Sequence, residues 1–144
     1  DSFVKNVQQE ACYNIKRLRN HACLALWCGN NETEMGIAFW HWPTTFNYSD
    51  ELYQRLKTDY DLLFKQILPE MVSSLDPARF YFSSSPIGFW ERKEDDNRGD
   101  NHYWGVWHGE EPFSEFKNRV PRFMSEYGFQ SFPILDSVKQ YSTV

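Results

Sequence analysis

The chain has 144 residues, which is the length of one domain that can bury a sizeable core. It carries 15 Lys and Arg against 20 Asp and Glu, a net charge of -5, and has no basic block, so the composition argues against nucleic-acid binding. No apolar run approaches the roughly 18 residues of a membrane-spanning helix, and we expect no membrane insertion.

Aromatic residues make up 18% of the chain, six of them Trp, although the mean hydropathy of -0.67 is polar. These rings either fill the core or lie in a cleft, where flat apolar faces stack on sugars or bases. Three cysteines, Cys12, Cys23 and Cys28, lack metal-site spacing, and we expect buried free thiols. The chain begins at Asp1 without a visible signal peptide, and we expect it to have been cut from a longer protein.

Short apolar or aromatic runs alternate with helical patterns along the chain. The runs predict strands at residues 24–27, 79–83, 102–108 and 122–125. Apolar residues three or four apart predict helices over residues 3–20, 51–66, 113–118 and 134–141. This alternation is typical of parallel βα units, so we expect an α/β fold.

Two features mark the predicted boundaries. Asp50 is the expected N-cap of the long helix over residues 51–66, and Pro69 either ends that helix or starts another turn through Val72. Residues 84–101, rich in Ser, Gly, Asp and Asn, predict a long surface loop, which in a compact domain is usually functional or disordered.

Polar side chains follow the first predicted strand. The apolar run LALWC is expected to be a buried parallel strand; it breaks at Gly29, and Asn31, Glu32 and Glu34 come soon after. In α/β folds the chemistry lies at the carboxyl ends of parallel strands. Glu32 and Glu34 are equal candidates for a functional carboxylate, and the alternative is that both are helix-start residues favoured by the dipole.

The fourth predicted strand ends in another glutamate, Glu126, followed by Gly128, which would permit a sharp turn. Because an unpaired buried charge costs several kcal/mol, Glu126 needs a partner or a chemical role. Two strands that each end in a glutamate predict a two-carboxylate site. At a separation of about 5 to 5.5 Å, one carboxylate can attack a glycosidic carbon while the other protonates the leaving oxygen.

His102 and His108 frame the aromatic run YWGVW. They either orient a carboxylate or a sugar hydroxyl, or are structural histidines. No His-x-x-x-His or paired-Cys pattern indicates a metal, and no G-x-S-x-G elbow indicates a serine nucleophile. We therefore expect neither a metal ion nor an organic cofactor, since two-carboxylate chemistry needs none.

Four segments, in order, resemble the catalytic domain of the β-mannosidases in glycoside hydrolase family 2: RLRNHACLALWCGNNETEMG, RFYFSSSP, HYWGVWHGEEPF and PRFMSEYGFQSFP. The resemblance implies a partial TIM (β/α)8 barrel, about strands four to seven with their helices, with residues 1–144 in one catalytic domain. It matches Glu32 to the general acid/base, Asn31 to its neighbouring sugar-binding amide, and Glu126 to the nucleophile. Glu34 keeps a helix-start role.

The same resemblance implies a mannose subsite lined by aromatic rings. Trp90, together with Trp104 or Trp107, matches rings of that subsite. His108 stands where relatives have Tyr, so the resemblance does not define its role. The implied function is that of a retaining exo-β-mannosidase, whose substrate is a terminal β-mannoside. The resemblance also implies that this chain is one part of a larger enzyme and acts together with the remainder of it.

A complete barrel of this kind needs roughly 200 to 250 residues, so we expect the isolated chain to be inactive and to form homo-oligomers through open strand edges. The resemblance favours a periplasmic, secreted or lysosomal location over a cytoplasmic one. The alternatives within the family are a β-galactosidase or β-glucuronidase. The alternative from another class is a noncatalytic carbohydrate-binding module that uses its aromatic cleft.

Overall fold

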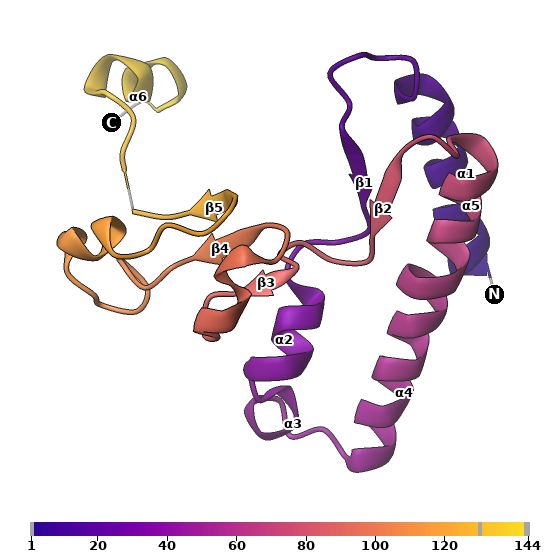
Figure 1. Cartoon of the computed structure of the whole chain (residues 1–144), viewed down its shortest axis with the longest axis horizontal. Coiled ribbons are helices and arrows are strands. Elements are labelled where there is room, and N and C mark those ends of the chain that lie inside the picture. The colour runs from indigo at the N-terminus through magenta and orange to yellow at the C-terminus, as the bar shows by residue number, and fades with distance from the viewer. Residues whose placement is uncertain (1, 130, 143–144) are drawn as a thin grey trace.

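The computed structural model describes residues 2–129 and 131–142, in which helices connect short strands (Figure 1). The helices are α1 (Ser2–Leu18), α2 (Thr33–Phe39), α3 (Trp42–Thr45), α4 (Asp50–Tyr60), η1 (Asp61–Ile67), α5 (Leu68–Leu75), η2 (Lys93–Asn97), η3 (Phe113–Lys117) and α6 (Leu135–Tyr141). The strands are β1 (Leu26–Cys28), β2 (Phe80–Phe82), β3 (Gly88–Phe89), β4 (Asn101–Tyr103) and β5 (Met124–Tyr127). None of the described helices has the length and apolar character needed to cross a membrane.

Every strand pairing among the described residues is parallel. β1 pairs with β2, and β4 lies between β3 and β5. A further parallel bridge joins Asn31 to Ser85, so the segments that leave β1 and β2 continue side by side. Helices therefore connect strands that run in the same direction, which confirms the predicted mixture of helices and parallel strands.

The third and fourth strands have bounds different from those predicted. The run over residues 102–108 is a strand only as far as Tyr103, because the chain then folds back on itself: the Glu111 N–H donates to the Gly105 carbonyl at 2.9 Å. The fourth strand begins at Met124, two residues later than predicted, since the first register pair with β4 joins Met124 to Asn101. Glu126 consequently lies inside β5 rather than beyond its end.

The long central helix is longer than predicted and has a different cap. Ser49, not Asp50, is its N-cap, because the Ser49 hydroxyl accepts from the Leu52 N–H at 3.2 Å. α4, η1 and α5 follow one another without a break, so Pro69 does not end the helix. Pro69 lies in the first turn of α5, where its missing N–H costs little. The intervening η1 is a π-helix, and its Phe64 carbonyl accepts the Tyr81 hydroxyl of β2 at 2.7 Å.

The stretch over residues 84–101 is not the long surface loop that its composition predicted. It contains β3 and η2, and it returns buried polar side chains to the sheet. Asn101 Nδ2 donates to the Gly88 carbonyl at 3.2 Å, and the Phe89 N–H donates to the Asp95 carboxylate at 3.2 Å. Small and polar residues are here because backbone and side chains meet closely: a Cβ on Gly88 would lie 2.5 Å from the Asp95 carbonyl.

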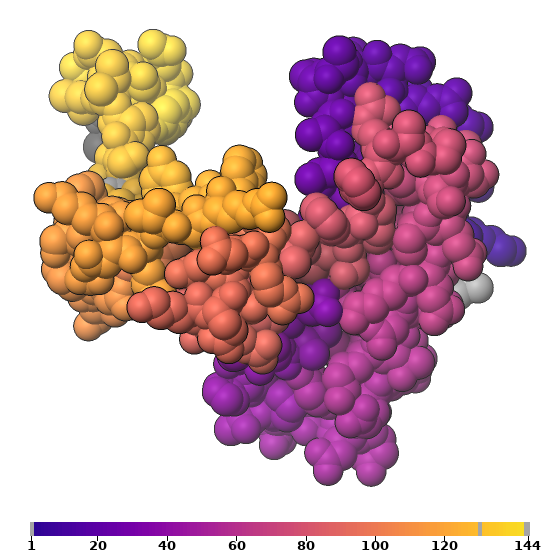
Figure 2. All heavy atoms as spheres, viewed as in Figure 1, coloured from indigo at the N-terminus to yellow at the C-terminus, as the bar shows by residue number. Residues whose placement is uncertain are grey.

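Burial is incomplete at the β1–β2 pair. Leu26 is 39% exposed and Phe80 77% exposed, so the expectation that β1 is a fully buried strand is wrong. The cysteines are free, as predicted, but Cys23 and Cys28 are exposed rather than buried. Both discrepancies have one reason: within the described residues the faces that carry these side chains are not covered. Figure 2 shows a wide hollow between the N-terminal segment and the C-terminal helix α6.

Candidate active site

Glu32 lies between the end of β1 and the start of α2, in a left-handed backbone conformation with φ of 59°. Its N–H donates to the Ser85 carbonyl at 2.6 Å and its carbonyl accepts the Gly36 N–H at 2.7 Å. A non-glycine residue in this conformation costs on the order of 1 kcal/mol. The Glu32 carboxylate makes no capping bond to the helix, so its side chain is available for other contacts.

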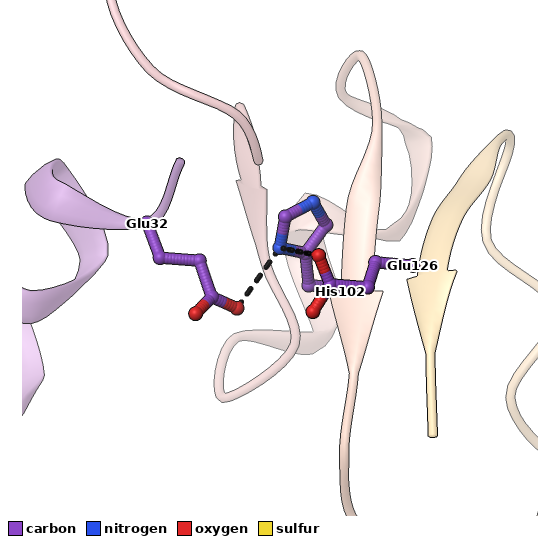
Figure 3. Close-up of side chains that lie close together, drawn as sticks. All are labelled: Glu32, His102 and Glu126. Carbon is purple, nitrogen blue, oxygen red and sulfur yellow. Dashed lines mark hydrogen bonds and ion pairs between the residues drawn. The ribbon is translucent and has the colours of Figure 1, made fainter. Parts of the chain in front are cut away.

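A buried histidine brings the two candidate glutamates together. His102 lies in β4, opposite Glu126 of β5 in the parallel register, and its side chain is 2% exposed. Its Nδ1 is 2.9 Å from Glu32 Oε1 and 3.6 Å from Glu126 Oε2. One carboxylate oxygen from each glutamate and one His102 nitrogen all lie within 4.8 Å of one another (Figure 3). Of the two predicted roles of His102, contact with a carboxylate is the one that the structure shows.

The indole of Trp104 forms a hydrogen bond to Glu126, the second of the two glutamates. Its Nε1–H donates to Glu126 Oε1 at 2.9 Å. The ring packs against Gly128, where an added Cβ would lie 1.8 Å from the nearest ring carbon. Gly128 does not have a positive φ, so the glycine gives room to Trp104 rather than a sharp turn to the chain.

The second nitrogen of His102 belongs to a chain of hydrogen bonds. His102 Nε2 lies 3.0 Å from Ser85 Oγ, and the Ser85 hydroxyl lies 2.5 Å from Asp100 Oδ2. The Ser125 hydroxyl donates to the same oxygen at 2.7 Å, while the Ile87 N–H donates to Asp100 Oδ1 at 2.9 Å. Burial opposes ionisation of Asp100, but these hydrogen bonds and the nearby His102 outweigh it and lower the pKa of its carboxyl.

Ser85, Asp100 and Ser125 were not among the residues predicted from the sequence. A signal did exist for Asp100, which precedes His102 by two residues, the spacing that places strand side chains on one face. The loop prediction for residues 84–101 concealed it. No local pattern marked Ser85, because it reaches His102 only through the fold.

Glu34 belongs to a different network from Glu32. It lies in the first turn of α2, and its carboxylate is 3.1 Å from Lys65 Nζ and accepts the Ser83 hydroxyl at 3.1 Å. Tyr60 also donates to it, at 3.4 Å. The two equal candidates of the sequence thus differ in surroundings: Glu34 is paired with a lysine, and Glu32 faces His102.

The remaining predicted side chains have varied positions. Asn31 is exposed, and the amide with structural contacts is instead that of Asn30, which donates to the Ser83 carbonyl at 2.7 Å. Three further residues lie away from the glutamate contacts. Trp90 packs edge-on against Tyr103, Trp107 is 45% exposed with its ring against Phe129, and His108 is exposed.

Burial and the charge of Glu32 both affect the pKa of a third carboxyl group, that of Glu91. The pKa of Glu91 is raised, first by partial burial and then by the nearby Glu32. Within residues 2–129 and 131–142, Glu32, His102 and Glu126 are also the one group of three with ligand atoms close enough for a metal ion. The His102 nitrogen in that group already forms a hydrogen bond of ordinary length with Glu32. The imidazole of His102 thus contacts the Glu32 carboxylate directly.

Comparisons with known proteins give related β-mannosidases. No family model matches the chain. It is 33% identical to Beta-mannosidase B of Neosartorya fischeri over 149 residues, which cover 97% of this chain and 17% of that protein. Beta-mannosidase B of Emericella nidulans is also 33% identical, over 98% of this chain and 17% of its own length. The crystal structure of a β-D-mannosidase from Dictyoglomus thermophilum covers 100% of this chain with a TM-score of 0.74 and 33% identity.

The matches cover almost all of this chain but only a small part of each relative. The chain spans 17% of the length of the curated relatives and 16% of the solved structure. Over almost its whole length the chain is therefore related to one segment of the β-mannosidases, which confirms the resemblance that its motifs indicated.

Proposed function

We propose that this chain is a segment of the catalytic (β/α)8 barrel of a retaining β-mannosidase, covering about strands four to seven, with residues 1–144 in that one domain. The parallel pairings of β1 with β2 and of β3, β4 and β5 support this architecture, since parallel strands with connecting helices form such barrels. The likeness to a segment of known β-mannosidases over nearly the whole chain supports the activity.

The observation that carries the mechanism is the approach of two glutamates from separate elements. Carboxylate oxygens of Glu32 and Glu126 lie within 4.8 Å. Retaining glycosidases hold their carboxyl groups about 5 to 5.5 Å apart, whereas inverting enzymes need about 6.5 to 9.5 Å to admit a water molecule. This separation favours a double displacement with retention of the anomeric configuration.

In the proposed reaction, a Glu126 oxygen attacks the anomeric carbon of a terminal β-mannoside. Glu32 donates a proton to the departing oxygen as the glycosidic bond breaks. Glu32, now a carboxylate, accepts a proton from a water molecule as that water attacks the anomeric carbon of the glycosyl-enzyme. The bond to Glu126 breaks, which releases mannose and regenerates the Glu126 carboxylate. The Trp104 N–H at Glu126 keeps one carboxylate oxygen in place, which leaves Oε2 as the attacking atom.

The substrate contacts follow from exposure. We assign Asn31 to the sugar, because its side chain is exposed and it directly precedes Glu32. Trp107 and His108 are exposed in the turn that follows β4, and they stay predictions as subsite residues. His102 and Trp104 act mainly through Glu32 and Glu126. Trp90, half-buried against Tyr103, stays a prediction as a subsite ring.

The test uses the full-length protein that contains this segment and an aryl β-mannoside. Glu126→Ala should reduce kcat/KM by more than about 10⁴-fold, since the covalent step is lost. Glu32→Ala should lose activity chiefly on poor leaving groups, and added azide should restore turnover by forming a β-mannosyl azide. Glu94→Gln, an exposed carboxylate in η2, is the control and should behave as wild type.

Four results would contradict the proposal. Near-normal turnover by Glu126→Ala would remove the nucleophile assignment. An α-configured first product, read by proton NMR, would exclude retention. Preference for β-galactosides or β-glucuronides would replace the substrate assignment, and binding of unchanged sugar with no turnover would favour a carbohydrate-binding module.

A further inference from the structure

The Ser85 hydroxyl decides where the hydrogens of His102 lie. A serine hydroxyl has one hydrogen to donate, and an ionised carboxylate can only accept. Ser85 Oγ has two partners, Asp100 Oδ2 at 2.5 Å and His102 Nε2 at 3.0 Å. Its one hydrogen is committed to Asp100, so Ser85 must accept the hydrogen of His102 Nε2. The lowered pKa of Asp100 supports its ionised state.

Because His102 Nε2 carries a hydrogen, the second ring nitrogen, Nδ1, needs a separate hydrogen for its contact with Glu32. His102 Nδ1 and Glu32 Oε1 are 2.9 Å apart, so a hydrogen lies between them. It belongs either to Glu32 as a carboxylic acid or to His102 as an imidazolium. In both states the pair holds two protons, one of which Glu32 can give away while His102 stays neutral.

We propose that Asp100 is a positioning residue that, through Ser85 and His102, keeps the transferable proton of the acid/base Glu32 in the site. The proposal rests on the proposed function of Glu32 and adds a reason why its proton is present before substrate arrives. During the reaction, that proton passes to the departing oxygen as Glu126 forms the bond to the anomeric carbon. The Nε2–H bond to Ser85 is unchanged throughout.

The same geometry fixes what an amide at position 100 would do. Asp100 Oδ1 accepts the Ile87 N–H at 2.9 Å, so Asn would turn its oxygen to Ile87 and its NH₂ group to Ser85 and Ser125. Ser85 would then accept from the amide and donate to His102 Nε2. The only ring hydrogen would lie on Nδ1, facing Glu32 as a carboxylate. The pair would hold one proton, and giving it away would leave an imidazolate.

The experiment compares leaving groups in the full-length protein. We measure kcat/KM, which reports the first irreversible step, for 2,4-dinitrophenyl β-mannoside and for an alkyl β-mannoside. The first needs no proton on its leaving oxygen, and the second does. Asp100→Asn should lose roughly 10²- to 10⁴-fold on the alkyl substrate, the range of general acid catalysis, and less than about threefold on the dinitrophenyl substrate.

Asp95→Asn is the matched control. Asp95 is a buried aspartate of the same stretch, whose side chain bonds to the Phe89 N–H and to Arg98 rather than to His102. Any loss in this variant should be equal for both substrates. An equal loss on both substrates for Asp100→Asn, or no loss, would overturn the proposal.

Ser85→Ala keeps the test decisive if Asp100→Asn does not fold. Without the hydroxyl, Asp100 Oδ2 lies 4.0 Å from His102 Nε2, beyond hydrogen-bond distance. We expect a leaving-group-dependent loss of at least about 10-fold on the alkyl substrate. Equal or absent effects would contradict a relay through Ser85. An inactive wild type or an active Glu126→Ala would instead refute the proposed function, so the two failures are distinguishable.

Discussion

Gly128→Ala tests how closely the Trp104 ring fits against the candidate nucleophile. The new Cβ would lie 1.8 Å from a ring carbon, whereas real Cβ contacts essentially never fall below 3.0 Å. The indole must therefore retreat by about 1 Å or more in a close-packed site. From a starting distance of 2.9 Å, such a shift breaks the Trp104 Nε1–H bond to Glu126 Oε1.

The magnitude follows from the kind of bond that is lost. A hydrogen bond to a charged group contributes about 1.5 to 3 kcal/mol, which corresponds to roughly 10- to 150-fold in kcat/KM if the bond persists in the transition state. The assay is hydrolysis of an aryl β-mannoside by the full-length protein. Trp104→Phe is the matched variant, because it keeps an aromatic ring at this position and removes the N–H donor.

The double variant identifies the cause. If both single changes act through one hydrogen bond, Gly128→Ala should add little to the loss already caused by Trp104→Phe. Values of kcat/KM within twofold of wild type for both single variants would refute the reasoning. Circular dichroism and Tm measurements separate a local shift from unfolding.

Two further predictions concern stability and assembly. The pKa of Asp76 is lowered, chiefly by the hydrogen bond from Trp27 Nε1 at 2.9 Å and, against the cost of burial, by Arg79. The ionised Asp76 therefore stabilises the fold at pH values above the pKa of an unfolded Asp, about 3.9. This stabilisation is lost as the pH falls through the lower pKa of Asp76 in the folded state. Asp76→Asn should lower Tm at pH 6 but flatten its fall between pH 6 and pH 3; an unchanged Tm profile would contradict this. The isolated 144-residue chain should lack mannosidase activity and self-associate, because β1 and β5 each have an open edge among the described residues and Phe80 is 77% exposed. A monomer in sedimentation velocity, or robust turnover, would argue against it.

The secondary structure was predictable where the pattern is local. Apolar spacing located the helix α1 to within two residues at each end, and short apolar runs located β1 and β2 to within two. The prediction of a long surface loop over residues 84–101 was wrong. The composition of this stretch is that of a loop, but its polar side chains form hydrogen bonds at the sheet and are buried there. For Pro69 the sequence left two alternatives open, and the structure shows the second, in which Pro69 lies in the first turn of a further helix through Val72.

The sequence by itself determined the parallel α/β character and indicated two candidate glutamates, because strand and helix periods and carboxylates close to apolar runs are local patterns. It left Glu32 and Glu34 equivalent until a family resemblance separated them. Only the tertiary structure decided that Glu34 faces Lys65 while Glu32 faces His102. The contacts of Asp100 with Ser85, and of Ser85 with His102, likewise appeared only there, since they depend on which atoms of separate segments meet. Strand register and side-chain rotamers set those meetings, and both are fixed by packing between segments far apart in the chain.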